Sequence, residues 1–463
     1  FEELDLSEYD LVLSSSSSCS KGVITRPDAV HICYCHTPIR YVWDFYYTYR
    51  DNANWLAKLV MPGQMHKMRI WDKCAADRVD YFIANSHYIA QRIKKYYRRD
   101  SDVIYPCCHI NESPFVEKED FYLTVGRLTW YKRVDLAVQA CTRLNKRLVV
   151  IGGGGELDKL RAMAGPTIEF KGGGLSDEEV RSYYLRAKGF LFPGEEDFGI
   201  TPVEAQSAGT PVLAYGRGGA CESVLPGRTG YWFKEQTVES LTDCIERFER
   251  DGVACSKEEI REHSRSFSEE RFERELKEYC LRRMADWQQE LLDCSRLQNG
   301  IKMNCEVLDF VAEATDAALF VEARIRQEGM QLVYSEPPEP YPVWADPARL
   351  RQVFVNLFDN AIKYSEPGGT IFLTLSRTPV TVSASIRDQG RGIAPDDLEK
   401  VKQKFFKAKN SVRGSGIGLA VVDEIVGTLG GKFDIASTLG QGTTVTVTLP
   451  VYHPGQEHLH DKI

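Results

Sequence analysis

The chain has 463 residues, more than one hydrophobic core usually organises, so its length predicts two or three domains. Hydrophobic residues make up 43% and charged residues 27%, and no apolar run reaches the roughly 18 to 20 residues that a membrane span needs. The net charge of −8 argues against a dedicated nucleic-acid-binding protein, because such proteins contact phosphates through surplus lysine and arginine. We therefore expect a cytoplasmic protein with no transmembrane segment and no nucleic-acid partner.

Residues 1–115 alternate short apolar stretches with helical ones, and the strand candidates are DLVLS, HICYC, YFIANS and DVIYP. This alternation is typical of a parallel sheet covered by helices. The chain starts at Phe1 in a segment that already reads as the middle of a domain. We expect this first α/β domain to be incomplete and to lack its first strands.

Residues 116–267 repeat the same alternation as a second α/β domain, with the strand candidates FYLTV, RLVVI, TIEF, GFLFP, PVLAY and GYWF. Two motifs follow strands in this domain, VGRLTWYKR and EDFGITPVEAQSAGTPVLA. Arg127 and Lys132, together with amides that open a helix, can stabilise negative charge on a departing diphosphate without a metal ion. Taken singly, Arg127 and Lys132 would more often be solvated surface residues, and a pair of glutamates such as Glu196 and Glu204 would more often cap a helix. The presence of all four in one strand–turn–helix context favours a binding site.

These two motifs resemble the C-terminal domain of retaining glycosyltransferases of the GT-B fold, in group 1 or family 4, which are built from two Rossmann-like domains. The resemblance implies a nucleotide-sugar donor and no required cofactor. Glu204 would bind the ribose hydroxyls, Glu196 would hold the donor sugar, and the two cations would hold the diphosphate. Phe198 and Gly199, where the helix opens, are expected to contact the donor.

HICYCHTPIRYVWD, from His31 to Asp44, resembles the N-terminal half of a subgroup of these enzymes, which would place His36 near the donor sugar as a catalytic residue. A structural histidine is the alternative. The runs DFYYTYR and QRIKKYYRRD are compatible with peripheral contact with a membrane, at its inner face, that carries a lipid-linked acceptor. A solvated basic helix face is the alternative there.

Residues 268–305 read as a long connecting helix that ends in ELLDCSRLQNG, and apolar residues recur along it at helical spacing. A different pattern begins in residues 306–452, where Val445, Val447 and Leu449 alternate with threonines as in a half-buried antiparallel strand. Residues 453–463 read as a tail. We expect two sequences of different origin to join near residues 286–290, where the helical phase continues without a flexible linker.

Four blocks stand in order near the C-terminus: NLFDNAIKYS, DQGRGI, KFFKAK and GSGIGLAV. Asn356 and Asn360 lie four residues apart, so on a helix their amide oxygens face a hydrated magnesium ion from one side. Lys363 lies one turn further on and can counter phosphate charge. The last block would open a helix whose N–H groups face phosphates, through Gly414, Gly416 and Gly418.

The blocks resemble, in this order, the N, G1, F and G2 boxes of sensor histidine kinases, whose ATP-binding domain is an α/β sandwich shared with gyrase and heat-shock chaperone ATPases. The resemblance implies Mg²⁺ with ATP, with Asn360 and Asn356 as the metal-site residues, and a response regulator as partner. Asp388 would accept the adenine amino proton, while Gly390 and Gly392 let the backbone approach the ring. Lys407 would contact a phosphate.

In residues 268–305, the resemblance also implies a remnant of the dimerisation helix of that family, represented by ELLDCSRLQNG. The phospho-accepting histidine of the family would stand upstream of this stretch, beside an acidic residue. The nearest upstream histidine, His263 in REHSRSF, has neither that neighbour nor the downstream proline. Three hypotheses follow. The chain transfers a sugar with retention and also binds Mg-ATP, or it is a sensor kinase fragment in two-component phosphotransfer, or it is a fusion of two incomplete domains that only binds nucleotides.

Overall fold

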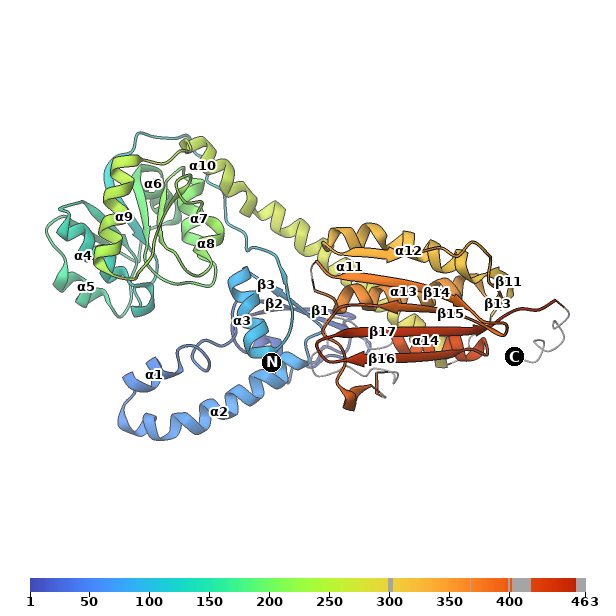
Figure 1. Ribbon diagram of the computed structural model, residues 1–463. Coiled ribbons are helices and arrows are strands. Elements are labelled where there is room, and N and C mark those ends of the chain that lie inside the picture. The colour runs from blue at the N-terminus through green and yellow to red at the C-terminus, as the bar shows by residue number, and fades with distance from the viewer. Residues whose placement is uncertain (299–302, 367, 399, 402–417, 455–463) are drawn as a thin grey trace. The chain divides into compact units, whose positions relative to one another are not determined.

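The computed structural model describes residues 1–298, 303–366, 368–398, 400–401 and 418–454, with the backbone alone at residues 52 and 290–298. It divides into two compact units, Phe1–Arg282 and Arg283–Ile463 (Figure 1). Helix α11 (Glu269–Gln298) runs through the boundary, which lies a few residues before the join that the sequence predicts. Within these described ranges, no helix is long and apolar enough to cross a membrane.

The first unit opens with a parallel sheet in which the described strands have the order β1–β2–β3–β4. Every residue of β2 is buried, so its apolar run HICYC is covered on both faces, as parallel sheets require. The four strands are β1 (Leu11–Ser16), β2 (Val30–Cys35), β3 (Tyr81–Ala84) and β4 (Asp102–Val103). The helical segments are η1 (Ser20–Gly22), α1 (Tyr46–Asn52), α2 (Trp55–Asp77) and α3 (His87–Tyr97).

A second parallel sheet follows in the same unit, with the order β10–β9–β8–β5–β6–β7. From β5 the chain builds outward in one direction to β7, and it then returns to build β8 to β10 on the other side. The direction therefore reverses between β5 and β8, and in such sheets ligands bind at the carboxyl ends of the two strands that flank the reversal. The strands are β5 (Glu119–Val125), β6 (Leu148–Ile151), β7 (Ile168–Gly172), β8 (Ala187–Phe192), β9 (Val212–Tyr215) and β10 (Gly230–Phe233).

Helices connect these strands, and their starts follow from the local sequence. Ser176 and Glu179 form a reciprocal capping box at the start of α6, and Ser256 and Glu259 form another at α10. The helical segments are η2 (Trp130–Lys132), α4 (Val134–Arg143), α5 (Leu157–Met163), α6 (Asp177–Arg186), α7 (Ile200–Ser207), α8 (Ala220–Ser223), α9 (Val238–Asp251), α10 (Lys257–Ser264) and η3 (Arg265–Phe267).

The second unit has a different architecture, a mixed sheet with the described order β12–β14–β15–β17–β16, in which only β12 and β14 run parallel. Val445, Val447 and Leu449 are buried, which confirms the strand that their alternation predicts. The strands are β12 (Gln331–Tyr334), β14 (Thr370–Arg377), β15 (Thr381–Arg387), β16 (Lys432–Thr438) and β17 (Gly442–Pro450), and a separate antiparallel pair is β11 (Glu306–Asp309) with β13 (Pro342–Ala345). The helical segments are α12 (Phe310–Gln327), α13 (Pro347–Tyr364), η4 (Pro395–Asp397) and α14 (Gly418–Thr428).

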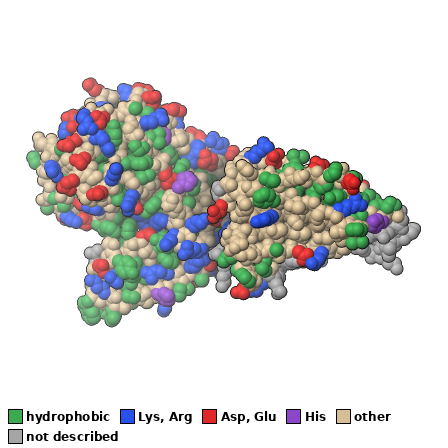
Figure 2. Space-filling view, in the orientation of Figure 1, with side chains coloured by type: hydrophobic (Ala, Val, Ile, Leu, Met, Phe, Trp, Pro, Cys, Tyr) green, Lys and Arg blue, Asp and Glu red, His purple; other side chains and the backbone are tan. Residues whose placement is uncertain are grey.

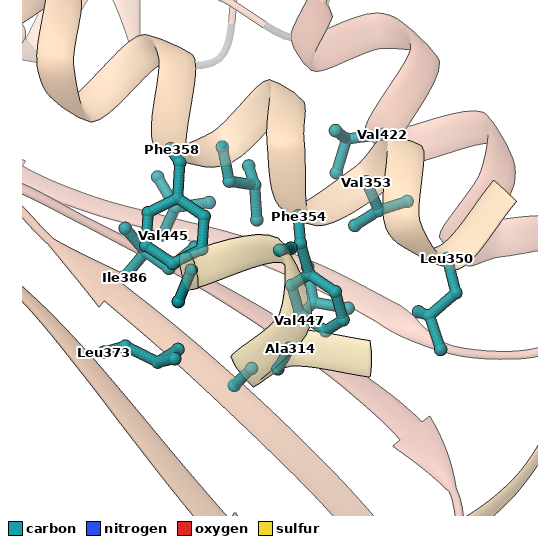
Figure 3. Close-up of a cluster of buried hydrophobic side chains, with 14 of the residues drawn as sticks. Ala314, Leu350, Val353, Phe354, Phe358, Leu373, Ile386, Val422, Val445 and Val447 are labelled. Carbon is teal, nitrogen blue, oxygen red and sulfur yellow. The ribbon is translucent and has the colours of Figure 1, made fainter. Parts of the chain in front are cut away.

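The core of this unit lies between the helices and one face of the sheet. Helix α13 starts at Pro347 behind the capping side chain of Asp346, and its buried residues recur every three or four positions. Figure 3 shows Phe354 and Phe358 pointing from α13 toward side chains of the sheet. The core residues that it labels around them are Ala314, Leu350, Val353, Leu373, Ile386, Val422, Val445 and Val447.

Replacing Phe354 by alanine is expected to lower the free energy of unfolding of the second unit by about 3 to 5 kcal/mol, because it leaves a cavity in a packed core. Phe354 is fully buried, and its ring centroid lies 5.4 Å from that of Phe310. Phe320 on α12 is 76% exposed, so Phe320→Ala is a matched control that should change stability little. Chemical denaturation of both variants tests this, and equal losses would contradict the packing described here.

Candidate functional site

A lysine and a glutamate meet at the reversal point of the second sheet. Lys132 lies in η2, just after β5, and Glu196 lies in the loop between β8 and α7. Their Nζ and Oε1 atoms are 2.8 Å apart, and both side chains are about four-fifths buried, at 19% and 20% exposure. A pocket at this edge is lined by Thr124, Val125, Gly126, Lys132, Val134, Phe192, Pro193 and Glu196. Two residues predicted to share a site are thus in direct contact.

The remaining residues predicted around this pocket come from the same two loops and from α7. Arg127 is exposed in the loop after β5. Glu204 lies on α7, where its Oε2 accepts a hydrogen bond of 2.9 Å from the Tyr184 hydroxyl, and burial raises the pKa of its carboxyl group. The backbone at Gly199 opens the helix with a φ of +87°, which L side chains rarely adopt.

The side chain of Phe198 is directed into an aromatic cluster. Its ring centroid lies 5.7 Å from that of Tyr105 and 5.5 Å from that of Phe267, and only 3% of the residue is exposed. Any contact that Phe198 makes with a ligand therefore has to come from its backbone. The side chain itself fixes the start of α7 against the rest of the unit.

His36 follows β2 in the first sheet and is half-buried. Its Nε2 is 2.8 Å from Ser15 Oγ, and its ring meets that of Tyr34 edge to face at 5.1 Å. Burial lowers the pKa of His36, although the nearby carboxylate of Asp197 opposes this effect. Burial thus favours the neutral imidazole, and the ring lies within electrostatic reach of the loop that carries Glu196.

The first sheet's domain holds the loop of residues 195–197 in place through four side chains. Arg40 and Arg92 both bind Asp197 Oδ1, at 2.5 and 2.8 Å. The Ser86 hydroxyl donates to the backbone oxygen of Asp197 at 2.6 Å, and the Tyr88 hydroxyl donates to Glu195 Oε1 at 2.9 Å. The position of Glu196 between these two acidic residues thus depends on both domains of the first unit.

Sequence reasoning missed this network. Arg40 and Arg92 are separated from Asp197 by 157 and 105 positions, so no local spacing connects them. Asp197 and Arg40 each lie inside a motif described above, but neither charged side chain had been given a role. These two charges without a role were the sequence feature that could have pointed to the ion pair. Arg92 belongs to the run QRIKKYYRRD and is only 8% exposed, so it does not contribute to a solvated basic face.

Replacing Asp197 by asparagine is expected to lower the stability of the first unit by about 1 to 3 kcal/mol, because it leaves the buried Arg92 guanidinium without one of its charged partners. The midpoint of thermal unfolding measures the loss, and faster hydrogen exchange near residues 86–97 and 195–198 would locate it. Asp28→Asn is the matched control, since Asp28 is 60% exposed in its pair with Arg26. An unchanged midpoint in the Asp197 variant would contradict the role of this network.

In the second unit, one side of α13 carries the polar residues that the sequence predicts. Asn356, Asn360 and Lys363 recur at four and three positions and are half-buried, while the apolar residues between them are buried in the core. A Cβ atom placed on Gly418, where α14 begins, would lie 3.9 Å from Asn360 Nδ2. The amide of Asn360 therefore faces the N-terminal turn of α14.

Asp388 follows β15 and is 5% exposed. Its Oδ1 accepts hydrogen bonds from the backbone N–H groups of Gly390, at 2.8 Å, and Thr443, at 3.1 Å. Burial raises the pKa of this carboxyl group, and the two backbone bonds partly offset that rise. These contacts fix the orientation of a carboxyl group at the end of the sheet.

The glycines after Asp388 allow a close backbone approach. A Cβ atom at Gly390 would lie 2.1 Å from the carbonyl oxygen of Tyr364, and one at Gly392 would lie 2.1 Å from that of Thr438. Neither position can hold a larger residue without a shift of the backbone. The loop after β15 is thereby pressed against the end of α13. Lys407, Gly414 and Gly416 lie outside the described residues.

Two separate parts of the chain match known protein families. "Glycosyl transferases group 1" matches residues 109–270, and "Histidine kinase-, DNA gyrase B-, and HSP90-like ATPase" matches residues 345–453. The chain carries one domain of each family. Both are transferase-type domains, and the α/β fold with GT-B-like parallel sheets and a C-terminal ATPase domain is the one that the sequence predicts.

Known relatives match the ATPase domain. Adaptive-response sensory kinase SasA of Synechococcus elongatus is 46% identical over 132 residues, which is 28% of this chain and 34% of the relative. Sensor histidine kinase ZraS of Escherichia coli is 43% identical over 109 residues, 24% of this chain and 23% of the relative. The chain thus spans about a third or less of these kinases. Among solved structures, sucrose-phosphate synthase of Thermosynechococcus elongatus is 18% identical, with a TM-score of 0.49 over 60% of this chain and 74% of its own.

Proposed function

We propose that the first unit transfers a sugar from a nucleotide-sugar donor to an acceptor with retention of configuration. The contact of Lys132 with Glu196 at the reversal point of the sheet carries this proposal. Breaking the bond between sugar and phosphate leaves negative charge on the nucleoside diphosphate. Lys132, Arg127 and the N–H groups that open α7 can stabilise that charge, and no metal ion is required for it.

In this proposal the ion pair opens when the donor binds. Lys132 turns to the diphosphate, and Glu196 becomes available to accept hydrogen bonds from hydroxyl groups of the donor sugar. Glu204, oriented by Tyr184, accepts from the ribose hydroxyls, together with the backbone at Phe198 and Gly199. His36, whose burial favours the neutral imidazole, faces the donor sugar from the other domain.

The test is to incubate the full chain with a panel of nucleotide sugars and to follow release of the nucleoside diphosphate. Slow hydrolysis of one donor without an acceptor is the expected result, because water can replace the acceptor in an assembled site. Failure of every donor to bind would overturn the proposal. Binding without hydrolysis would support a fusion that only binds nucleotides.

We also propose that the second unit binds ATP with Mg²⁺. The donor set fits the ion, because Mg²⁺ takes oxygen ligands and Asn356 and Asn360 each offer an amide oxygen on α13, with Asn360 beside the N-terminal turn of α14. When bound, Mg²⁺ would neutralise charge on the triphosphate oxygens. Lys363 adds positive charge on the same side of α13, and Asp388 accepts from the adenine amino group beside Gly390 and Gly392. The remaining proposed phosphate contacts are Lys407, Gly414, Gly416 and Gly418.

Phosphotransfer to a response regulator is the second candidate activity, favoured by the sensor kinases that match the ATPase domain. His263 is poorly placed to accept a phosphoryl group, because its Nε2 lies 2.9 Å from the Ser223 carbonyl oxygen and its ring packs on Phe267. Labelled ATP that leaves acid-labile, base-stable phosphate on the chain would support this activity. We also propose that the chain has five parts. They are two α/β domains, a connecting helix, the ATP-binding domain and a tail, at residues 1–115, 116–267, 268–305, 306–452 and 453–463.

A further inference from the structure

Large apolar side chains are exposed together on α1 and the first turns of α2. Trp55 is 74% exposed and Leu59 is 75% exposed. Their spacing, and that of Leu56 and Val60, is four residues, so the four side chains share one side of the helix. Tyr47 on α1 is also exposed, and we call these five residues the α2 surface. In Figure 2, green side chains gather at the lower left, where Figure 1 draws α1 and the start of α2.

Helix α2 is held in the fold by its other end. Its buried residues are Asp72, Ala75 and Ala76, all in its last two turns. Asp72 accepts from Trp43 Nε1 at 2.7 Å and pairs with the buried Lys21 at 2.5 Å. The turns before Asp72 have no buried residue, so the apolar side chains at the start of α2 contribute nothing to the core.

The charge on α2 before Asp72 has one sign, while Asp51 on α1, four residues before Trp55, is exposed and paired with Arg50. Residues 52–71 contain Lys58, Lys67 and Arg69 but no aspartate or glutamate, in a chain whose net charge is −8. Lys58 and Lys67 are exposed, and Lys58 lies next to Leu59. A helix that combines exposed tryptophan and leucine with lysine suits the interface of a membrane with anionic headgroups.

We propose that the α2 surface binds the surface of an anionic phospholipid bilayer. Trp55, Leu56, Leu59 and Val60 enter the boundary between headgroups and acyl chains, while Lys58 and Lys67 meet the anionic headgroups. The helix lies in the interface and does not span the bilayer. This proposal assigns the membrane contact to α1 and α2, not to the run around Arg92, and it is independent of the donor site.

The test is sedimentation of the full chain with phosphatidylcholine vesicles, with and without phosphatidylglycerol. We expect binding that requires phosphatidylglycerol and weakens as salt rises. Lys58→Gln should lower the partition coefficient by about fivefold. The double variant Trp55→Ser, Leu59→Ser should lower it by roughly ten- to a hundredfold, because two apolar anchors are lost.

Leu281→Ser is the matched control, since Leu281 is 56% exposed on α11 of the same unit and should not alter vesicle binding. Hydrogen exchange at residues 55–62 should slow when the vesicles are added. Equal sedimentation of the wild-type chain and the double variant would overturn the proposal. So would a wild-type dimer that the double variant converts to a monomer, because the α2 surface would then be an interface between two copies. Donor hydrolysis should be the same in the double variant without vesicles, which separates this test from that of the proposed transfer reaction.

Discussion

Replacing Glu196 by alanine is expected to lower the rate of nucleoside-diphosphate release from a nucleotide sugar by about a hundredfold or more, the loss typical when a preorganised polar group is removed from a reaction centre. The substitution removes the proposed acceptor for the sugar hydroxyls and also the partner that orients Lys132. Steady-state measurement of diphosphate release by the full chain tests this prediction.

The control for this variant is Glu239→Ala. Glu239 lies on α9 of the same domain, is 70% exposed and pairs with Arg143 on the surface, so its loss should leave the rate unchanged. Glu196→Gln should recover part of the lost rate, because its amide oxygen still accepts a hydrogen bond. Full activity in the alanine variant would place the reaction elsewhere in the chain.

Replacing Asn360 by aspartate is expected to weaken Mg-ATP binding by about tenfold or more, since it adds a negative charge close to the triphosphate and removes the amide N–H group. Asn360→Ala, which removes the amide oxygen without adding charge, should weaken binding in the same direction. Calorimetric titration of Mg-ATP into each variant measures the change.

The same amide-to-acid change at Gln331 supplies the control. Gln331 is exposed on β12, at the edge of the sheet in the same unit, so Gln331→Glu should leave the affinity for Mg-ATP near that of the wild-type chain. Equal weakening in both variants would mean that net charge, and not the position of Asn360, determines the result.

Local patterns predicted much of the fold. The apolar runs FYLTV and RLVVI became the adjacent strands β5 and β6, because each is short, apolar and followed by a turn. The alternation around Val447 became β17 for the same kind of reason. The resemblance to group 1 glycosyltransferases assigned Lys132 and Glu196 to one donor site. The structure brings the two side chains into contact because both follow strands of one parallel sheet, whose carboxyl ends meet at one edge.

Long-range contacts and exposure were not predictable in this way. The ion pairs of Arg40 and Arg92 with Asp197 depend on how two domains of the first unit pack together, and no period in the sequence encodes that packing. The spacing of Trp55, Leu56, Leu59 and Val60 matches that of a helix face packed in a core. Only the structure shows that this face is exposed, because the buried residues of α2 all lie in its last turns.

Two independent nucleotide sites, one in each unit, can be tested by a crossed titration. The wild-type chain, Glu204→Ala and Asn360→Asp are each titrated with Mg-ATP and with the nucleotide sugar that the wild-type chain binds. We predict that Glu204→Ala lowers only the affinity for the nucleotide sugar and that Asn360→Asp lowers only the affinity for Mg-ATP. Equal weakening of both ligands by either substitution would contradict the assignment of one nucleotide site to each unit.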